Sequence, residues 1–151
     1  MSEDQLYSTE AGFRQALNGI YVELNHADLY GDELLVNTVE ILAQRYKFSS
    51  MGTLTNQYHL AEFDYTTDYA KKCGSRIWEK AYALIANVNK LLKNADSHKD
   101  LFTGDSYDLI TGEAYALRAF LHFDLVRLFG WGNLAKKPEN LEKLCMPYMT
   151  K

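Results

Sequence analysis

Both prolines of this chain, Pro138 and Pro147, lie near its end, and none precedes Pro138. A proline inside a helix removes a backbone hydrogen bond and clashes with the preceding turn, so most of the chain is free to form long helices. Strand signals are weak, because few short runs alternate apolar with polar residues and no Asn-Gly or Asp-Gly pair joins two alternating segments. The 151 residues therefore predict an all-α fold of about one domain.

The strongest helical pattern covers residues 105–129, where apolar residues form two stripes. One stripe is Leu109, Gly112, Ala116, Ala119, Phe120 and Phe123, and the other is Ile110, Ala114, Leu117, Leu121, Leu125 and Leu128. A helix that is apolar on two sides must be covered on both, so we expect it to lie between its neighbours. Gly130 follows the last periodic residue, where we expect a left-handed helix cap.

Two further helices are predicted at residues 9–24 and 68–93. The first carries one apolar face, with Ser8 or Thr9 as its N-cap. The second is one-faced as well, and Lys90 and Lys93 complement its C-terminal dipole before Asn94. The helices at 68–93 and 105–129 would form an antiparallel αα-hairpin, the unit of tetratricopeptide-like stacks.

The remaining segments show weaker patterns. Residues 26–65 form a long irregular connection with one or more helical turns, and a connection of this length is usually functional. The tail after Trp131 predicts a loop with a turn of helix at residues 139–144. Cys73 and Cys145 match no metal or redox motif, so a disulfide and two free thiols are equally open.

Charge and hydropathy exclude several functions. The formal net charge is −4 and no basic cluster exceeds two adjacent lysines, which argues against nucleic-acid binding. No window of eighteen apolar residues predicts a membrane span. The first residues show neither a basic nor an apolar leader segment, so the chain itself is expected to be soluble and unanchored.

No residue pattern indicates catalysis, a cofactor or a metal. The four histidines lack the spacing of a metal site, and no Cys-His pair could activate a nucleophile. Glu113 with Arg118 and Asp124 with Arg127 are better explained as ion pairs of helices than as an acid and base. Arg118 lies between two apolar stripes, so it needs a carboxylate or carbonyl partner.

Aromatic residues divide into two groups. Those within helical patterns are expected to pack in the core: Phe13, Tyr21, Trp78, Tyr82, Phe120 and Phe123. Those in the 26–65 connection alternate with carboxylates, amides and an arginine, a mixture that suits a carbohydrate, although tyrosine-rich loops also pack over helix ends. The candidate ligand-binding residues are Tyr30, Asp32, Arg45, Tyr46, Asn56 and Tyr58.

Three segments resemble the RagB/SusD family in the right order. Residues 112–130 are similar to its helix E-A-x-x-x-R-A-x-x-x-F-D-L-V-R-L-F-G, and residues 78–92 to W-x-x-x-Y-x-x-I-x-x-x-N-x-x-L. Residues 13–21 resemble the family's opening helix with its Gly-Ile-Tyr. Met146-Pro147-Tyr148 is similar to the step after the third helix, although Tyr148 replaces the usual aliphatic residue.

This resemblance implies a SusD-like helical scaffold without enzymatic activity. Family members are surface lipoproteins of the Bacteroidota outer membrane that bind glycans for a SusC-like TonB-dependent transporter. The matching scaffold positions are expected to be structural: Trp78, Tyr82, Asn89, Arg118, Phe123, Phe129 and Gly130. The resemblance also implies that residues 1–151 are an N-terminal portion of a longer lipoprotein, shown without its signal peptide and lipidated cysteine. Later helices would then cover the exposed apolar side of the third helix.

A second interpretation stays open. The same apolar stripes would suit a helical-hairpin module that binds a partner protein. In that case residues 26–65 would bind no ligand.

Overall fold

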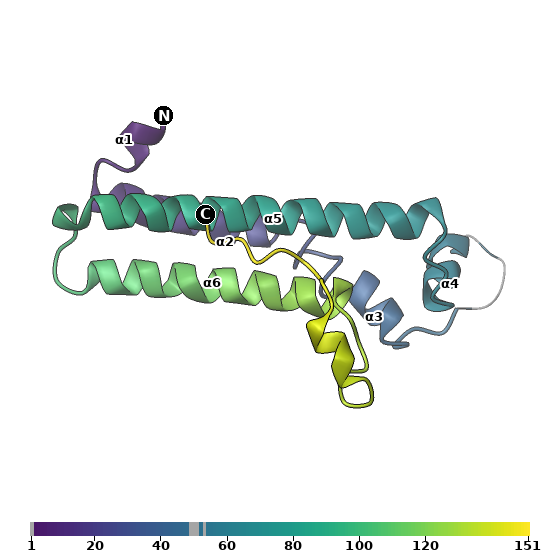
Figure 1. Ribbon diagram of the computed structural model, residues 1–151. Coiled ribbons are helices and arrows are strands. Elements are labelled where there is room, and N and C mark those ends of the chain that lie inside the picture. The colour runs from purple at the N-terminus through teal and green to yellow at the C-terminus, as the bar shows by residue number, and fades with distance from the viewer. Residues whose placement is uncertain (1, 49–51, 53) are drawn as a thin grey trace. The chain divides into compact units, whose positions relative to one another are not determined.

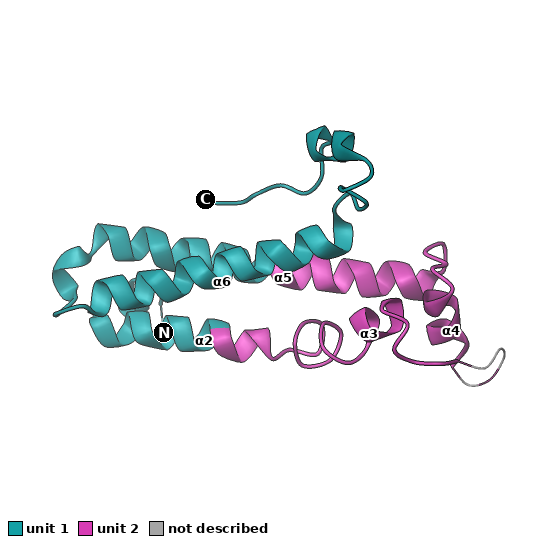
Figure 2. Cartoon of the chain, turned by 90° about the horizontal axis from the view of Figure 1, so that it is seen from below, with its two compact units in different colours: residues 1–20, 83–151 teal, residues 21–82 magenta. Residues whose placement is uncertain are grey.

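The computed structural model describes residues 2–48, 52 and 54–151, and within them every regular element is a helix (Figure 1). This confirms the all-α prediction. Residues 1–20 and 83–151 form one compact unit, unit 1, and residues 21–82 form another, unit 2 (Figure 2). The helices are α1 (Glu3–Leu6), α2 (Glu10–Leu24), α3 (Thr38–Leu42), α4 (Thr55–Ala61), α5 (Asp68–Ser97), η1 (Lys99–Leu101), α6 (Ser106–Phe129) and η2 (Pro138–Glu142).

Unit 1 is built on a helical hairpin. The part of α5 from residue 83 onward runs antiparallel beside α6, and a short connection containing η1 joins the two (Figures 1 and 2). Each large aliphatic side chain buried here stabilises the fold by about 1.5–3 kcal/mol. The buried apolar residues of this hairpin are Leu84, Ile85, Val88, Leu91, Leu92, Ala95, Ile110, Ala114, Leu117, Leu121 and Leu125.

Helix α2 begins as the sequence predicted. The Thr9 hydroxyl accepts a hydrogen bond from the Gly12 N–H at 3.2 Å, which satisfies a free donor of the first turn. Gly12 cannot be replaced easily, because a Cβ there would lie 1.7 Å from the Leu6 carbonyl oxygen. The sequence analysis missed α1, which begins with a capping box between Ser2 and Gln5.

Helix α6 ends at Phe129 as predicted, but the predicted end of α5 and the predicted conformation of Gly130 were wrong. Helix α5 continues past Asn94 to Ser97, because the Asn94 side chain donates to the Lys90 carbonyl at 2.9 Å within the helix and Ala95 is fully buried. Gly130 ends α6 with extended backbone, φ −79° and ψ 167°, rather than as a left-handed cap. Glycine is favoured there for space, since a Cβ would lie 2.4 Å from the Val126 carbonyl oxygen.

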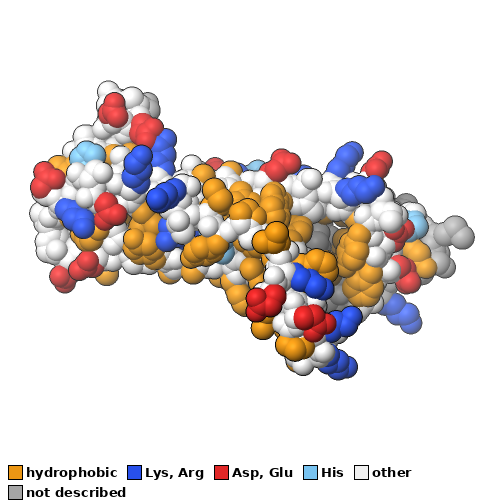
Figure 3. Space-filling view, viewed as in Figure 1, with side chains coloured by type: hydrophobic (Ala, Val, Ile, Leu, Met, Phe, Trp, Pro, Cys, Tyr) orange, Lys and Arg blue, Asp and Glu red, His pale blue; other side chains and the backbone are white. Residues whose placement is uncertain are grey.

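Helix α6 buries only one of its two apolar stripes. The stripe containing Ile110 and Leu121 lies in the core, whereas Leu109, Phe120 and Phe123 are 58%, 47% and 59% exposed. Figure 3 shows hydrophobic side chains gathered over α6 on this face. The prediction that α6 is covered on both sides is therefore wrong for this chain, because a hairpin partner covers one side of a helix.

The other aromatic residues of the helices differ in how far they are buried. Phe13 is fully buried and its ring lies 4.9 Å from that of Tyr7 and 4.8 Å from that of Phe102, as predicted for a core residue. Trp78 and Tyr82 are half-buried, with ring centroids 4.9 Å apart. Tyr21 is 43% exposed, so its predicted place in the core, like that of Phe120 and Phe123, was wrong.

Unit 2 contains the predicted irregular connection. Its core cluster joins Ile41 of α3, Leu60 of α4 and Ala70 of α5. Residues 25–37 fold into consecutive turns before α3. Residues 49–51 and 53 of the predicted Ser-, Gly- and Thr-rich stretch lie outside the described residues.

The structure also shows the state of the two cysteines and the local structure of the tail. Cys73 and Cys145 are free thiols, the first buried and the second exposed. The predicted turn of helix in the tail is the 3-10 helix η2, with Pro138 in its first turn.

Candidate functional site

The six candidate ligand residues all lie in unit 2, on three local segments. Tyr30 and Asp32 belong to the turns at 25–37, Arg45 and Tyr46 follow α3, and Asn56 and Tyr58 lie on α4. Arg45, Tyr46 and Asn56 are exposed, and the other three are half-buried. Among the described residues, no hydrogen bond or ion pair joins any two of Asp32, Arg45, Tyr46, Asn56 and Tyr58.

Two of these segments are nevertheless connected. The Tyr46 hydroxyl donates to the Val36 carbonyl at 2.7 Å, which ties it to the end of the 25–37 turns. Asp32 accepts a hydrogen bond from the Asn37 amide at 3.3 Å in the same turns. Tyr46 is 45% exposed, with its ring 6.2 Å from that of Phe48. Tyr46 therefore presents an aromatic surface beside the segment that carries Asp32.

A buried polar cluster holds the 25–37 turns to α5. The Glu33 carboxylate, whose side chain is 4% exposed, accepts from Arg76 at 2.6 Å and from the Thr38 hydroxyl at 2.5 Å. Arg76 also pairs with Asp28 at 3.5 Å. Burial lowers the pKa of Arg76, but the neighbouring Glu33, Cys73 and Asp28 together outweigh it and raise that pKa above its ordinary value, so Arg76 stays charged.

The cluster continues toward Tyr69. Burial first, and then the neighbouring Cys73 and Glu33, raise the pKa of the Tyr69 phenol to about 12. The Cys73 thiol lies 3.9 Å from the Glu33 carboxylate. Sequence analysis missed this cluster because Glu33 and Arg76 are far apart in the chain and belong to no motif.

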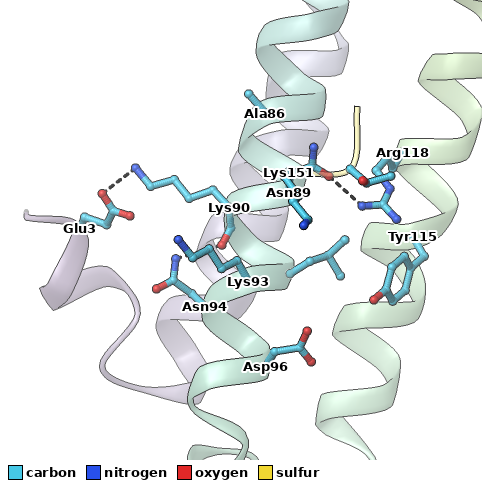
Figure 4. A pocket seen from close by; sticks show the side chains of 12 residues that line it. Glu3, Ala86, Asn89, Lys90, Lys93, Asn94, Asp96, Tyr115, Arg118 and Lys151 are labelled. Atoms are coloured by element: carbon cyan, nitrogen blue, oxygen red, sulfur yellow. Dashed lines mark hydrogen bonds and ion pairs between the residues drawn. The ribbon is translucent and has the colours of Figure 1, made fainter. Parts of the chain in front are cut away.

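Unit 1 contains a pocket of about 760 Å³, which we call the basic pocket (Figure 4). Figure 4 shows Tyr115 and Arg118 extending from α6, and Lys90 and Lys93 extending from α5 on the side of Glu3. Its lining is Glu3, Ala86, Asn89, Lys90, Leu92, Lys93, Asn94, Asp96, Tyr115, Arg118, Thr150 and Lys151. Its volume falls within the range typical of small-ligand sites.

A closed ring of hydrogen bonds contains two lining residues of the basic pocket, Asn89 and Arg118. Arg118 Nη1 donates to the Asn89 side-chain oxygen at 2.8 Å, and the Asn89 amide donates to the Met149 carbonyl at 3.2 Å. The Met149 N–H donates to His122 Nε2 at 3.1 Å, and His122 Nδ1 lies 2.8 Å from the Arg118 carbonyl. The Asn89 oxygen is the carbonyl partner that the sequence required for Arg118.

The ring of hydrogen bonds fixes the tautomer of the His122 imidazole. Nε2 accepts from Met149, so the proton of the neutral imidazole is on Nδ1, which donates to the Arg118 carbonyl. His122 is 3% exposed, and its ring centroid lies 4.3 Å from that of Tyr148. The tail is thereby attached to α5 and α6 of the same unit.

Sequence analysis did not identify the basic pocket as a site. It interpreted Lys90 and Lys93 as charges that complement a helix end, and it placed Asn89 and Arg118 in the scaffold. The available signal was the spacing of three between the two lysines, which places both on one side of α5. Asp124 and Arg127 do form the predicted ion pair of one helix, at 2.7 Å.

The part of the chain that the structure describes contains neither a candidate metal site nor a candidate membrane-spanning helix. No three His, Cys, Asp or Glu side chains there come together as metal ligands. None of the described helices is both long enough and apolar enough to cross a bilayer.

Comparison with known proteins decides the family. A SusD-like family model, described as "Starch-binding associating with outer membrane", matches residues 1–151. The chain belongs to the SusD-like family. The match confirms the resemblance seen in the three helical segments, and it places the chain in a family described by starch binding and association with the outer membrane.

Two curated relatives come from Formosa agariphila. SusD-like protein P2 is 26% identical over 130 residues, which cover 86% of this chain and 25% of the relative. SusD-like protein P25 is 26% identical over 148 residues, covering 95% of this chain and 28% of the relative. The chain thus spans about a quarter of the length of these relatives. No solved structure matches it significantly.

Proposed function

We propose that this chain is the N-terminal helical portion of a surface lipoprotein that binds a glycan and delivers it to a SusC-like TonB-dependent transporter. The observation that carries the proposal is the family match over all 151 residues, with its description of starch binding at the outer membrane. The relatives are about four times as long as the aligned segment, which agrees with a portion of a larger protein. The proposed role is capture without catalysis, so the ligand leaves unchanged.

Within this chain, the proposed glycan contacts lie in unit 2. Tyr46 supplies an exposed ring for the apolar face of a sugar, and Asp32 and Arg45 supply groups that bond to hydroxyls. Tyr30, Asn56 and Tyr58 complete the set. The Glu33–Arg76 ion pair supports the site by holding the turns that carry Tyr30 and Asp32.

Calorimetric titration of the folded chain with a panel of oligosaccharides tests this function. We expect binding of at least one glycan, and a loss of about tenfold in affinity for Tyr46→Ala, as expected for one aromatic stacking contact. Tyr46→Phe keeps the ring but removes the bond to Val36, so it separates stacking from loop attachment. Tyr65→Ala is the matched control, since Tyr65 is 57% exposed in the same unit and outside the candidate set.

The exposed stripe of α6 favours a second function, a protein-interaction module. Leu109, Phe123 and Val126 are 58%, 59% and 49% exposed on a regular helix, which suits a helix-packing partner. Absence of binding to every glycan, combined with concentration-dependent association that Phe123→Ser reduces, would favour this function over glycan capture.

A further inference from the structure

Residues 131–145 project from the rest of unit 1 as a closed loop, which we call the tail loop. The Trp131 indole N–H donates to the Leu144 carbonyl at 2.9 Å, and the Asn140 side chain donates to the Gly132 carbonyl at 2.8 Å. These two bonds join the start of the loop to its end, with η2 between them. Figures 1 and 2 show η2 standing apart from α5 and α6. The tail loop is therefore held by its own contacts and presents its side chains outward.

The tail loop exposes large apolar side chains. Leu144 is 97% exposed, Leu141 67%, Trp131 51% and Leu134 42%. Single exposed leucines are ordinary on a protein surface, but here the hydrogen bond between Trp131 and Leu144 brings an aromatic and an aliphatic residue together. Transfer of such side chains from water into an apolar medium is favourable, so this loop is suited to contact one.

Lysines accompany these apolar side chains. Lys143 Nζ lies 4.5 Å from the centre of the Trp131 ring, and Lys136 and Lys137 are exposed on the same loop. The three lysines of residues 131–145 outnumber the two glutamates, so the loop is positive although the whole chain carries a formal charge of −4. Tryptophan, leucine and lysine together are typical of segments that lie at a membrane–water interface. Protein–protein interfaces, in contrast, are depleted in lysine.

We propose that the tail loop lies on an anionic lipid surface. Leu141 and Leu144 insert among the acyl chains, the Trp131 ring lies at the level of the headgroups, and Lys143 pairs with their negative charges. The contact lies on the membrane and does not cross it, which agrees with the described helices, none of which could span a bilayer. The inference rests on the proposed place of the protein at the outer membrane, and it adds a direct contact between this chain and the lipid.

The fluorescence of Trp131 tests this contact directly. The chain has two tryptophans, so Trp78→Phe leaves Trp131 as the single reporter. The probes are vesicles of phosphatidylcholine alone and vesicles of equal parts phosphatidylglycerol and phosphatidylcholine. With the anionic vesicles we expect a blue shift, quenching by lipids brominated on their acyl chains, and weaker binding as salt is added. Unchanged Trp131 emission would overturn the proposal, even if the chain bound the vesicles through another surface.

Paired variants separate the tail loop from general hydrophobicity. Leu141→Ser with Leu144→Ser should weaken vesicle binding about tenfold or more. Val22→Ser with Leu35→Ser, at residues of unit 2 that are 72% and 55% exposed, should leave it unchanged. Circular dichroism checks that both variants are folded, and equal effects of the two pairs would overturn the proposal.

Oligosaccharide titration of the same chain keeps this inference distinct from glycan capture. Glycan binding by a chain that does not bind the vesicles would overturn the lipid contact alone. Vesicle binding through Trp131 by a chain that binds no glycan would overturn glycan capture alone.

Discussion

Asn89 and Arg118 connect α5 to α6 through one hydrogen bond of 2.8 Å, and the same Asn89 side chain also holds the Met149 carbonyl. Asn89 is 6% exposed, so Asn89→Ala leaves two polar groups without their partner in a mostly buried place. We predict a loss of about 2–3 kcal/mol in the free energy of unfolding, measured by urea denaturation. Asn87→Ala, at an exposed position of the same helix, is the control. Equal stability of the two variants would contradict a structural role for Asn89.

The side chain of His122 should hold the tail against α5 and α6. Its Nε2 accepts the Met149 N–H at 3.1 Å, and the Asn89 amide donates to the Met149 carbonyl. His122→Phe keeps an aromatic ring beside Tyr148 but removes the acceptor of the Met149 N–H. We therefore predict that the tail of this variant is released more often.

Amide hydrogen exchange of Met149 measures this release directly, with both chains held at the same pH. We expect protection in the unmodified chain and low protection in His122→Phe. A Met149 amide that is equally protected in the two chains would rule out a role of His122 in holding the tail.

Removal of Arg76 should loosen the turns that carry Tyr30 and Asp32. Arg76→Ala leaves the buried Glu33 carboxylate without its cation, although Thr38 remains bonded to it. We predict a cost of about 2 kcal/mol in unfolding free energy, below the value for a fully buried pair because Arg76 is half exposed. Arg45→Ala is the control. A double-mutant cycle with Glu33→Gln should show coupling between the two positions, and additive effects would argue against it.

Gly130 and Gly132 form a natural pair for testing the end of α6. A Cβ at Gly130 would lie 2.4 Å from the Val126 carbonyl oxygen, whereas a Cβ at Gly132 would have no neighbour within 4 Å. We predict that Gly130→Ala lowers stability by about 1–3 kcal/mol and that Gly132→Ala is nearly neutral, measured by thermal unfolding. Similar melting temperatures for the two variants would contradict the steric explanation.

The sequence predicted the long helices well because their signals are local. Thr9 caps α2 as expected, and the stripe that contains Ile110 and Leu121 faces the core. Errors arose where the same residue type can either end a helix or play another structural role. Asn94 was interpreted as a helix end but bonds within α5, and Gly130 is needed for space rather than for a left-handed backbone.

The candidate sites were less predictable, since they depend on contacts between distant residues. Nothing local in the sequence pairs Glu33 with Arg76, or brings Met149 to Asn89 and His122. Aromatic and polar composition alone indicated the unit 2 residues, and their role as ligand contacts remains a proposal. The basic pocket arises from the hairpin of α5 and α6, which brings Asn89 of one helix to Arg118 of the other.

The most direct test of glycan capture is a titration of the isotope-labelled chain with oligosaccharides, followed by amide NMR. We predict saturable shifts at Tyr46 and its neighbours. A well-dispersed spectrum that no glycan changes would contradict the account, because the chain would then be folded but unable to bind the ligand class proposed for it.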